Sequence, residues 1–256
     1  MTRGTWNRAM AVAAVLVLAG SGFAAARDLP YSETYDRSFP LAAGGRVSLE
    51  NINGDVRIEV GNRDEVVVHA VKQADSSDWL ASISIDVDAH PGSVQVKTRL
   101  KHSDWYDTHQ SRVDYTLTVP RWAELDGIEL VNGDVVISGV EGGARIRTVN
   151  GEIDAQKLTG DVELSTVNGR VNATLDPVAA DNVKLTTVNG RLELSLPASA
   201  SADVTARTVN GRITAGFGLV VNEHRFVGSD VSGRIGGGGA RISLRTVNGS
   251  LVIRSL

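Results

Sequence analysis

One four-residue phrase, Thr-Val-Asn-Gly, recurs through the second half of the chain and limits the folds open to it. We take the Asn of each copy, or the Ser of a degenerate copy, as its mark. From Asn132 onward, successive marks are 18, 18, 21, 21, 22 and 16 residues apart. A period of about 20 residues is typical of solenoid proteins. The marks are Asn132, Asn150, Asn168, Asn189, Asn210, Ser232 and Asn248, with an isolated Asn-Ile-Asn-Gly copy at Asn53.

Aliphatic residues occupy fixed positions around each mark. The third residue after it is always aliphatic: Val135, Ile153, Val171, Leu192, Ile213, Ile235 and Leu251. The fourth residue before it is aliphatic in most copies: Ile128, Ile146, Leu164, Leu185, Ala206 and Leu244. Alternation of this kind indicates strands with one buried face.

The alternation changes parity across each Asn-Gly, so a straight strand would turn its apolar face to water there. A bend restores the register, and Asn and Gly are the residues that tolerate the positive φ of a tight bend. We therefore predict structural turns at these pairs. They are Asn132 and Gly133, Asn150 and Gly151, Asn168 and Gly169, Asn189 and Gly190, Asn210 and Gly211, and Asn248 and Gly249.

Asn-Gly between alternating runs is also a strong hairpin signal, so an array of antiparallel hairpins is the alternative architecture. Only parallel stacking places each residue type on its own copy in the next coil, where Asn and aliphatic ladders are favourable. We therefore predict an all-β protein, a parallel β-solenoid (β-helix) of about seven coils. An N-terminal antiparallel β cap region is expected to cover its first coil.

The chain is predicted to have three regions. Residues 1–26 are predicted to be a signal peptide, because a positively charged N-terminal segment is followed by an apolar stretch and by small residues before a cleavage site. Residues 27–125 lack the repeat and are expected to form the β-strand cap region, and 126–256 the β-solenoid repeats. The signal peptide predicts export, to the periplasm or to secretion at the cell surface.

Composition narrows the classes of partner. The formal net charge is −4, and removal of the two arginines in residues 1–26 makes it −6, which argues against nucleic acid. Apart from residues 1–26, no stretch is long and apolar enough for a membrane span. The chain has no cysteine, which excludes disulfides and thiolate metal sites. We expect no cofactor and no metal.

Three segments resemble one known family. They are the Thr-Val-Asn-Gly repeats, the segment Leu49-Glu-Asn-Ile-Asn-Gly-Asp-Val56 and the segment Tyr115-Thr-Leu-Thr-Val-Pro120. Together they are similar to the bacterial exported putative-adhesin family of unknown function, over roughly residues 40–256. The resemblance implies a β-helix fold and a cell-envelope location. It implies no catalytic residues, and the family name does not establish adhesion.

A column of arginines is the main candidate binding feature. Two residues after the mark stand Asp134, Glu152, Arg170, Arg191, Arg212, Arg234 and Ser250. If the coils stack, the four arginines line one face. They could form a solvated surface, or a stripe that pairs with carboxylates or phosphates.

Other polar and aromatic groups offer weaker candidates. His102, Asp104, Asp107 and His109 could hold a divalent ion, although their spacing fits no common metal motif and a polar loop is the simpler interpretation. Aromatic residues of the N-terminal region could stack on sugars or fill a core. Asp154 and Glu193 each stand four residues after the mark of their repeat. Stacked coils could bring them together like the two carboxylates of a polysaccharide lyase or hydrolase. We interpret this shared position as coincidence.

The sequence therefore predicts no enzyme. It predicts a cell-envelope β-solenoid scaffold or binding protein, adhesin-like, whose partner is an anionic glycan or an envelope protein. The alternative function is a polysaccharide-active β-helix enzyme. Since the chain ends shortly after its last Asn-Gly, the final coil is expected to be uncovered and to allow oligomers through an open solenoid end.

Overall fold

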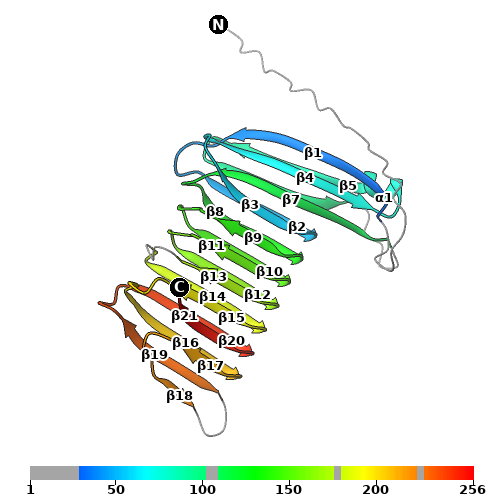
Figure 1. Ribbon diagram of the computed structural model, residues 1–256. Helices are drawn as coiled ribbons and strands as arrows, with labels where there is room; N and C mark the ends of the chain where they lie inside the picture. Colours follow the sequence, from blue (N-terminus) through cyan, green and yellow to red (C-terminus); the bar gives the residue numbers. More distant parts are fainter. Residues whose placement is uncertain (1–28, 102–108, 176–179, 224–227) are drawn as a thin grey trace.

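The protein is an elongated stack of β-strands with an antiparallel cap at its N-terminal end (Figure 1). We describe it from a computed structural model of the chain, which describes residues 29–101, 109–175, 180–223 and 228–256. The predicted signal peptide lies outside these residues. Among the described residues, the strands form two sheets, called here sheet A and sheet B, of ten and eleven strands.

Sheet A contains the cap strands and the shorter strand of each coil. Its spatial order is β1 (Tyr31–Pro40), β4 (Glu65–Ala74), β7 (Ser111–Pro120), β3 (Val56–Gly61), β9 (Val135–Ser138), β11 (Ile153–Gln156), β13 (Val171–Thr174), β15 (Leu192–Leu196), β21 (Leu251–Ser255) and β17 (Ile213–Ala215).

Sheet B contains the longer strand of each coil. Its spatial order is β18 (Val221–Glu223), β19 (Ser229–Ile235), β16 (Ala202–Asn210), β20 (Ala240–Asn248), β14 (Asn182–Asn189), β12 (Val162–Asn168), β10 (Ala144–Asn150), β8 (Glu124–Asn132), β2 (Arg46–Asn53), β6 (Ser93–Leu100) and β5 (Ile83–His90). A short helix, α1 (Ser77–Ser82), connects β4 to β5, and the Ser76 side chain caps it by accepting from the Trp79 backbone N–H.

The repeats stack in parallel with like residues paired, which confirms the solenoid and rules out the hairpin array. Thr148 pairs with Thr166, and Asn150 with Asn168. In sheet A, Ile153 pairs with Val171. Each coil is one strand of sheet B, a corner at Asn-Gly and one strand of sheet A, so each residue type forms its own ladder.

The aliphatic positions of both sheets face inward and form one core. Ile146 and Leu164 of sheet B and Ile153 and Val171 of sheet A are at most 1% exposed. Burial of such a side chain stabilises the fold by about 1.5–3 kcal/mol before chain entropy is counted. Because one coil buries its face only against the next, neighbouring coils must fold together.

The parallel ladder begins earlier than residue 126. Strand β2 lies parallel to β8 with Asn53 paired to Asn132, and β3 lies parallel to β9. The isolated Asn-Ile-Asn-Gly copy is therefore the first coil of the stack. The division of the chain at residue 125 stays a prediction.

The predicted cap is present on both sheets. Antiparallel β1, β4 and β7 extend sheet A beyond β3, and antiparallel β5 and β6 extend sheet B beyond β2. Strand β1 and helix α1 were not predicted. The sequence Tyr31–Pro40 lacks an aliphatic alternation, because β1 is an edge strand whose residues are mostly exposed.

The order of the last coils differs from their order in the sequence. Strand β20 lies between β14 and β16, and β21 lies between β15 and β17. The last repeat of the chain is thus an interior coil, and our expectation that it is uncovered is wrong. Within the described part, the stack ends instead at β17 in sheet A and at β18 in sheet B.

The degenerate copy at Ser232 does not form a coil. It lies on β19, which runs antiparallel to β16 and pairs Thr205 with Ser232. After β19 the chain turns through residues 236–239 and enters the stack as β20. An interior position satisfies the backbone groups of β20 on both of its edges, whereas an outer position would satisfy only one.

Candidate functional site

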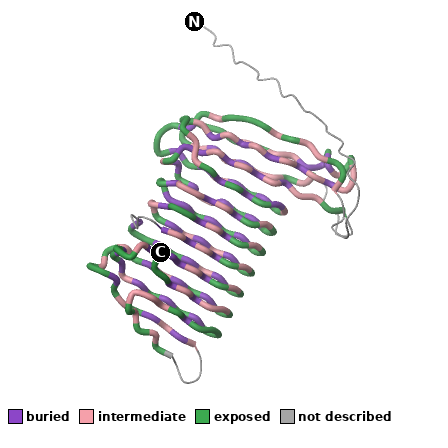
Figure 2. The backbone as a smooth tube through the Cα atoms, in the orientation of Figure 1, coloured by how far each residue is buried: buried purple, intermediate pink, exposed green. Residues whose placement is uncertain are grey.

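The corners between the two sheets form one long edge of the molecule, which we call the Asn-Gly edge. We number its seven levels from the cap. In that order they carry Asn53, Asn132, Asn150, Asn168, Asn189, Asn248 and Asn210. The strand ends along this edge are exposed (Figure 2).

The asparagine side chains of the edge form a continuous hydrogen-bonded ladder. The amide of Asn150 donates to Asn132 Oδ1 at 2.8 Å, and the amide of Asn168 donates to Asn150 Oδ1 at 2.8 Å. The same bond repeats across all six steps between the levels, at 2.8–2.9 Å. The predicted turn asparagines therefore also fix the register of neighbouring coils.

Replacement of one ladder residue should have a moderate effect, because the amides are exposed and water can replace the lost partner. We expect Asn168→Ala to lower the free energy of unfolding by about 0.5–1.5 kcal/mol. Urea unfolding followed by circular dichroism measures it. Ser165→Ala, on the same strand but outside the ladder, is the matched control, and an equal loss in both variants would contradict a role for the ladder.

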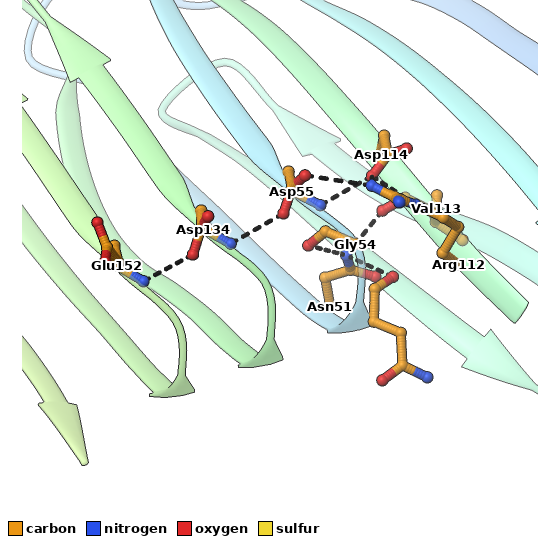
Figure 3. A network of polar contacts seen from close by, with 9 residues as sticks. Asn51, Gly54, Asp55, Arg112, Val113, Asp114, Asp134 and Glu152 are labelled. Carbon is orange, nitrogen blue, oxygen red and sulfur yellow. Dashed lines mark hydrogen bonds and ion pairs between the residues drawn. The ribbon is translucent and has the colours of Figure 1, made fainter. Parts of the chain in front are cut away.

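The column two residues after each Asn is acidic near the cap, and its carboxylates bind the backbone (Figure 3). Asp134 Oδ1 accepts from the Glu152 backbone N–H at 2.7 Å, and Asp55 Oδ1 accepts from the Asp134 N–H at 3.0 Å. Arg112 donates to Asp55 and Asp114, and the hydrogen bond to Asp114 raises the pKa of Arg112. These carboxylates therefore have a structural role.

The same column is basic in the distal half of the stack. Arg170 pairs with Glu152 at 3.7 Å. Arg191 Nε donates to the Ser250 hydroxyl at 3.2 Å. Arg212 is exposed, and its side chain has no hydrogen bond or ion pair with any residue that the structure describes. The inserted last coil places Ser250 between Arg191 and Arg212, so these two arginines are two levels apart.

Arg234 is not part of this column. It lies on antiparallel β19, where it pairs with Asp203 at 2.9 Å. The hydrogen bond between them lowers the pKa of Asp203 and raises the pKa of Arg234. The expectation of four stacked arginines is therefore wrong for Arg234, because sequence spacing gives no sign that the strand reverses.

The valines of the repeat form an exposed apolar line beside the asparagine ladder, which we call the valine stripe. Each member is 38–41% exposed. In stack order they are Ile52, Val131, Val149, Val167, Val188, Val247 and Val209. This surface was not predicted from the sequence, although period-two alternation places the residue before Asn on the solvent side of its strand.

A second column of charges lies on the other side of the valine stripe, three residues before each Asn. In stack order it reads Glu50, Glu129, Arg147, Ser165, Thr186, Arg245 and Arg207. All of its charged members are exposed. Like the first column, it is acidic near the cap and basic at the distal end.

The remaining candidates do not form a site. Asp154 and Glu193 lie on β11 and β15 with Asn172 between them, and Glu193 pairs with Arg254 at 2.7 Å. His102, Asp104 and Asp107 are outside the described residues. His109 pairs with Asp75 at 2.9 Å. In the part of the chain that is described, no three His, Asp or Glu side chains are grouped so that they could hold a metal ion.

One known family matches the part of the chain that carries these corners. The Toastrack DUF4097 family model matches residues 46–254. The chain belongs to the Toastrack DUF4097 family. The match covers every coil of the toastrack from β2 onward, and so agrees with a ladder that starts at Arg46. No helix in the described residues has the length and apolar character that a membrane crossing requires.

Solved structures of distant sequence are similar to this toastrack chain. A protein from Clostridium sporogenes described as a putative cell adhesion protein has 12% identity, covers 87% of this chain and 100% of its own, and has a TM-score of 0.49. A putative adhesin from Bacteroides fragilis has 10% identity, coverages of 87% and 97%, and a TM-score of 0.37. No curated protein matches the sequence. The fold assignment therefore depends on the strand register described above.

Proposed function

We propose that this toastrack protein is a non-catalytic scaffold or binding protein of the bacterial cell envelope, periplasmic or at the cell surface. Its partner is an anionic envelope component, a glycan in the first instance, which binds along the distal half of the Asn-Gly edge. Arg191 and Arg212 are the residues expected to contact it. The signal-peptide pattern of residues 1–26 supports the envelope location.

The observation that carries this proposal is an asymmetry within one column. The acidic members Asp55 and Asp134 bind backbone N–H groups. The basic members have no such role. The Arg212 side chain has no partner among the described residues, the Arg191 side chain donates only to a neutral hydroxyl, and Arg170 pairs with Glu152. Two exposed guanidinium groups about 10 Å apart can bind successive anionic groups of an extended chain.

The test is direct binding of polysaccharides of defined charge. The mature protein is titrated by calorimetry with a sulfated, a carboxylated and a neutral polysaccharide. We expect the anionic chains to bind, the neutral chain not to bind, and Arg191→Gln/Arg212→Gln to weaken binding at least about tenfold. Comparison of the sulfated and carboxylated chains identifies the preferred anion.

The matched control is Arg57→Gln/Lys157→Gln. It removes the same charge from exposed residues whose side chains have no hydrogen-bond or ion-pair partner within the described ranges, one on β3 and one just after β11. The control should bind like the parent protein. If both double variants lose affinity equally, only net charge matters and the proposed site is wrong.

A further inference from the structure

The valine stripe is a continuous exposed apolar line along the Asn-Gly edge. Its seven members lie on consecutive strands about 4.8 Å apart, so the stripe is about 29 Å long. Contiguous exposed apolar patches beyond a few hundred Å² are rare on monomeric soluble proteins and mark interaction sites. Isolated exposed valines would need no explanation, but a line of seven at one repeat position does.

The charges beside the stripe separate by sign along its length. The two flanking columns place Glu50 and Asp55 at level 1, and Arg207 and Arg212 at level 7. Within the two columns, levels 1 and 2 carry four acidic residues and no basic residue. Three of these carboxylates also pair with a cation of their own chain: Glu50 with Lys97 at 2.8 Å, Asp55 with Arg112 at 3.1 Å and Glu129 with Arg147 at 3.6 Å. Levels 4 to 7 carry Arg170, Arg191, Arg245, Arg207 and Arg212 and no acidic residue.

We propose that the Asn-Gly edge is the interface of a homodimer, in which the valine stripes of two copies pack against each other in antiparallel orientation. The two-fold axis crosses the stripe at Val167, the middle level. The axis lies in the plane of the interface and is perpendicular to the stripe. Rotation about it reverses the direction of the stripe but keeps each flanking column on its own side. Level 1 of one copy therefore faces level 7 of the other.

This arrangement is self-complementary in charge. Glu50 faces Arg207 of the second copy, and Asp55 faces its Arg212. One level further in, Glu129 faces Arg245, and nearer the axis Glu152 faces Arg191. Symmetry repeats all four pairings. Such exposed pairs contribute little affinity, but they select the partner and its orientation. A parallel dimer would place like charges together at both ends of the stripe.

Only the central level opposes like charges. Arg170 would lie near Arg170 of the second copy, but each of them is already paired with Glu152 of its own chain at 3.7 Å. A membrane is less well matched as the occupant, because levels 1 and 2 would hold four carboxylates against anionic headgroups. Among occupants of the stripe, a second copy therefore opposes each half of the two columns with residues of the opposite sign, and its carboxylates would be shared between their own cation and the facing arginine.

The small size of the Asn-Gly edge limits the affinity that we expect for the dimer. An apolar line one residue wide with polar flanks is at the low end of specific interfaces, where association is weak. Dissociation constants in the micromolar range or weaker are expected, and affinity should fall with added salt. The dimer does not depend on the proposed function, although a bound polyanion would compete for the same arginines.

The absence of cysteine in the chain allows a direct test of register. Single-cysteine variants of the full mature chain are oxidised without polysaccharide, and covalent dimers are counted on a non-reducing gel. Val167→Cys should cross-link to itself. Ile52→Cys and Val209→Cys should each fail to cross-link alone but cross-link when mixed. Val220→Cys, on an exposed valine outside the stripe, is the matched control and should not cross-link.

Sedimentation velocity of the cysteine-free parent over a range of concentrations completes the test. We expect a monomer–dimer equilibrium that Val149→Asp weakens at least about tenfold and Val220→Asp leaves unchanged. Unfolding curves confirm that each variant is folded. A parent that stays monomeric at millimolar concentration overturns the proposal, as does Ile52→Cys cross-linking to itself. A monomer that floats with phosphatidylglycerol vesicles would assign the stripe to lipid instead.

Discussion

Gly169→Ala should destabilise the protein by about 3 kcal/mol, because the coils approach each other too closely for a side chain at this corner. A Cβ on Gly169 would lie 2.0 Å from the carbonyl oxygen of Gly151 in the neighbouring coil. That atom belongs to the backbone, so relief requires the coils to move apart. Overpacking of this kind costs about 1–3 kcal/mol, and the φ of +151° adds strain.

The measurement is the free energy of unfolding in urea, with Gly92→Ala as the matched control. Gly92 also lies in a turn, but a Cβ added there would meet no atom within 4 Å, and its φ is not in the left-handed region. The control should stay within about 0.5 kcal/mol of the parent. Equal stability of Gly169→Ala and the parent would show that the coils can separate at no cost, contrary to the ladder described here.

Removal of residues 240–256 should unfold far more than the last repeat. Strand β20 pairs with β14 on one side and with β16 on the other, and β21 lies between β15 and β17 in the same way. Without them, β16 to β19 have no parallel connection to the rest of the stack. We expect the truncated chain to lose amide hydrogen-exchange protection from residue 202 onward, while β8, β10, β12 and β14 remain protected because β14 still pairs with β12.

A stack in sequence order predicts a different result. Loss of its last repeat would shorten the rod by one coil and leave β16 protected, since each repeat of a solenoid contacts only its neighbours. Hydrogen exchange read by mass spectrometry separates the two outcomes. Deletion of the exposed Leu256 alone is the control and should leave protection in β16 unchanged. Retained protection in β16 of the long truncation would contradict the interior position of β20.

Most of the repeating architecture was predictable from the sequence. Recurrence of Thr-Val-Asn-Gly at about 20 residues indicated parallel coils, and the change of parity at each Asn-Gly indicated the corners. Both follow from local chemistry, because side chains alternate along a strand and a register is repaired only by a bend. Strand β7 of the cap is equally predictable, since its buried residues Val113, Tyr115, Leu117 and Val119 alternate with more exposed ones.

The candidate site was only partly predictable. The column containing Arg170, Arg191 and Arg212 was identified from spacing alone, whereas Arg234 was assigned to it in error. The valine stripe could have been found from the alternation, since the residue before each Asn has the opposite parity to Ile146 and Leu164. The separation of charge by sign in the two columns beside the stripe could not have been predicted, because the order of the levels was unknown.

By itself the sequence determined the repeating unit of this protein: a strand, an Asn-Gly corner and a second strand, with an aliphatic face inside. Only the tertiary structure decided the order of the units, in which the last repeat is inserted between those of Asn189 and Asn210. The reason is physical. Near-identical coils offer near-identical edges to their neighbours, so local chemistry cannot specify which coil pairs with which, whereas the connections through β18 and β19 can.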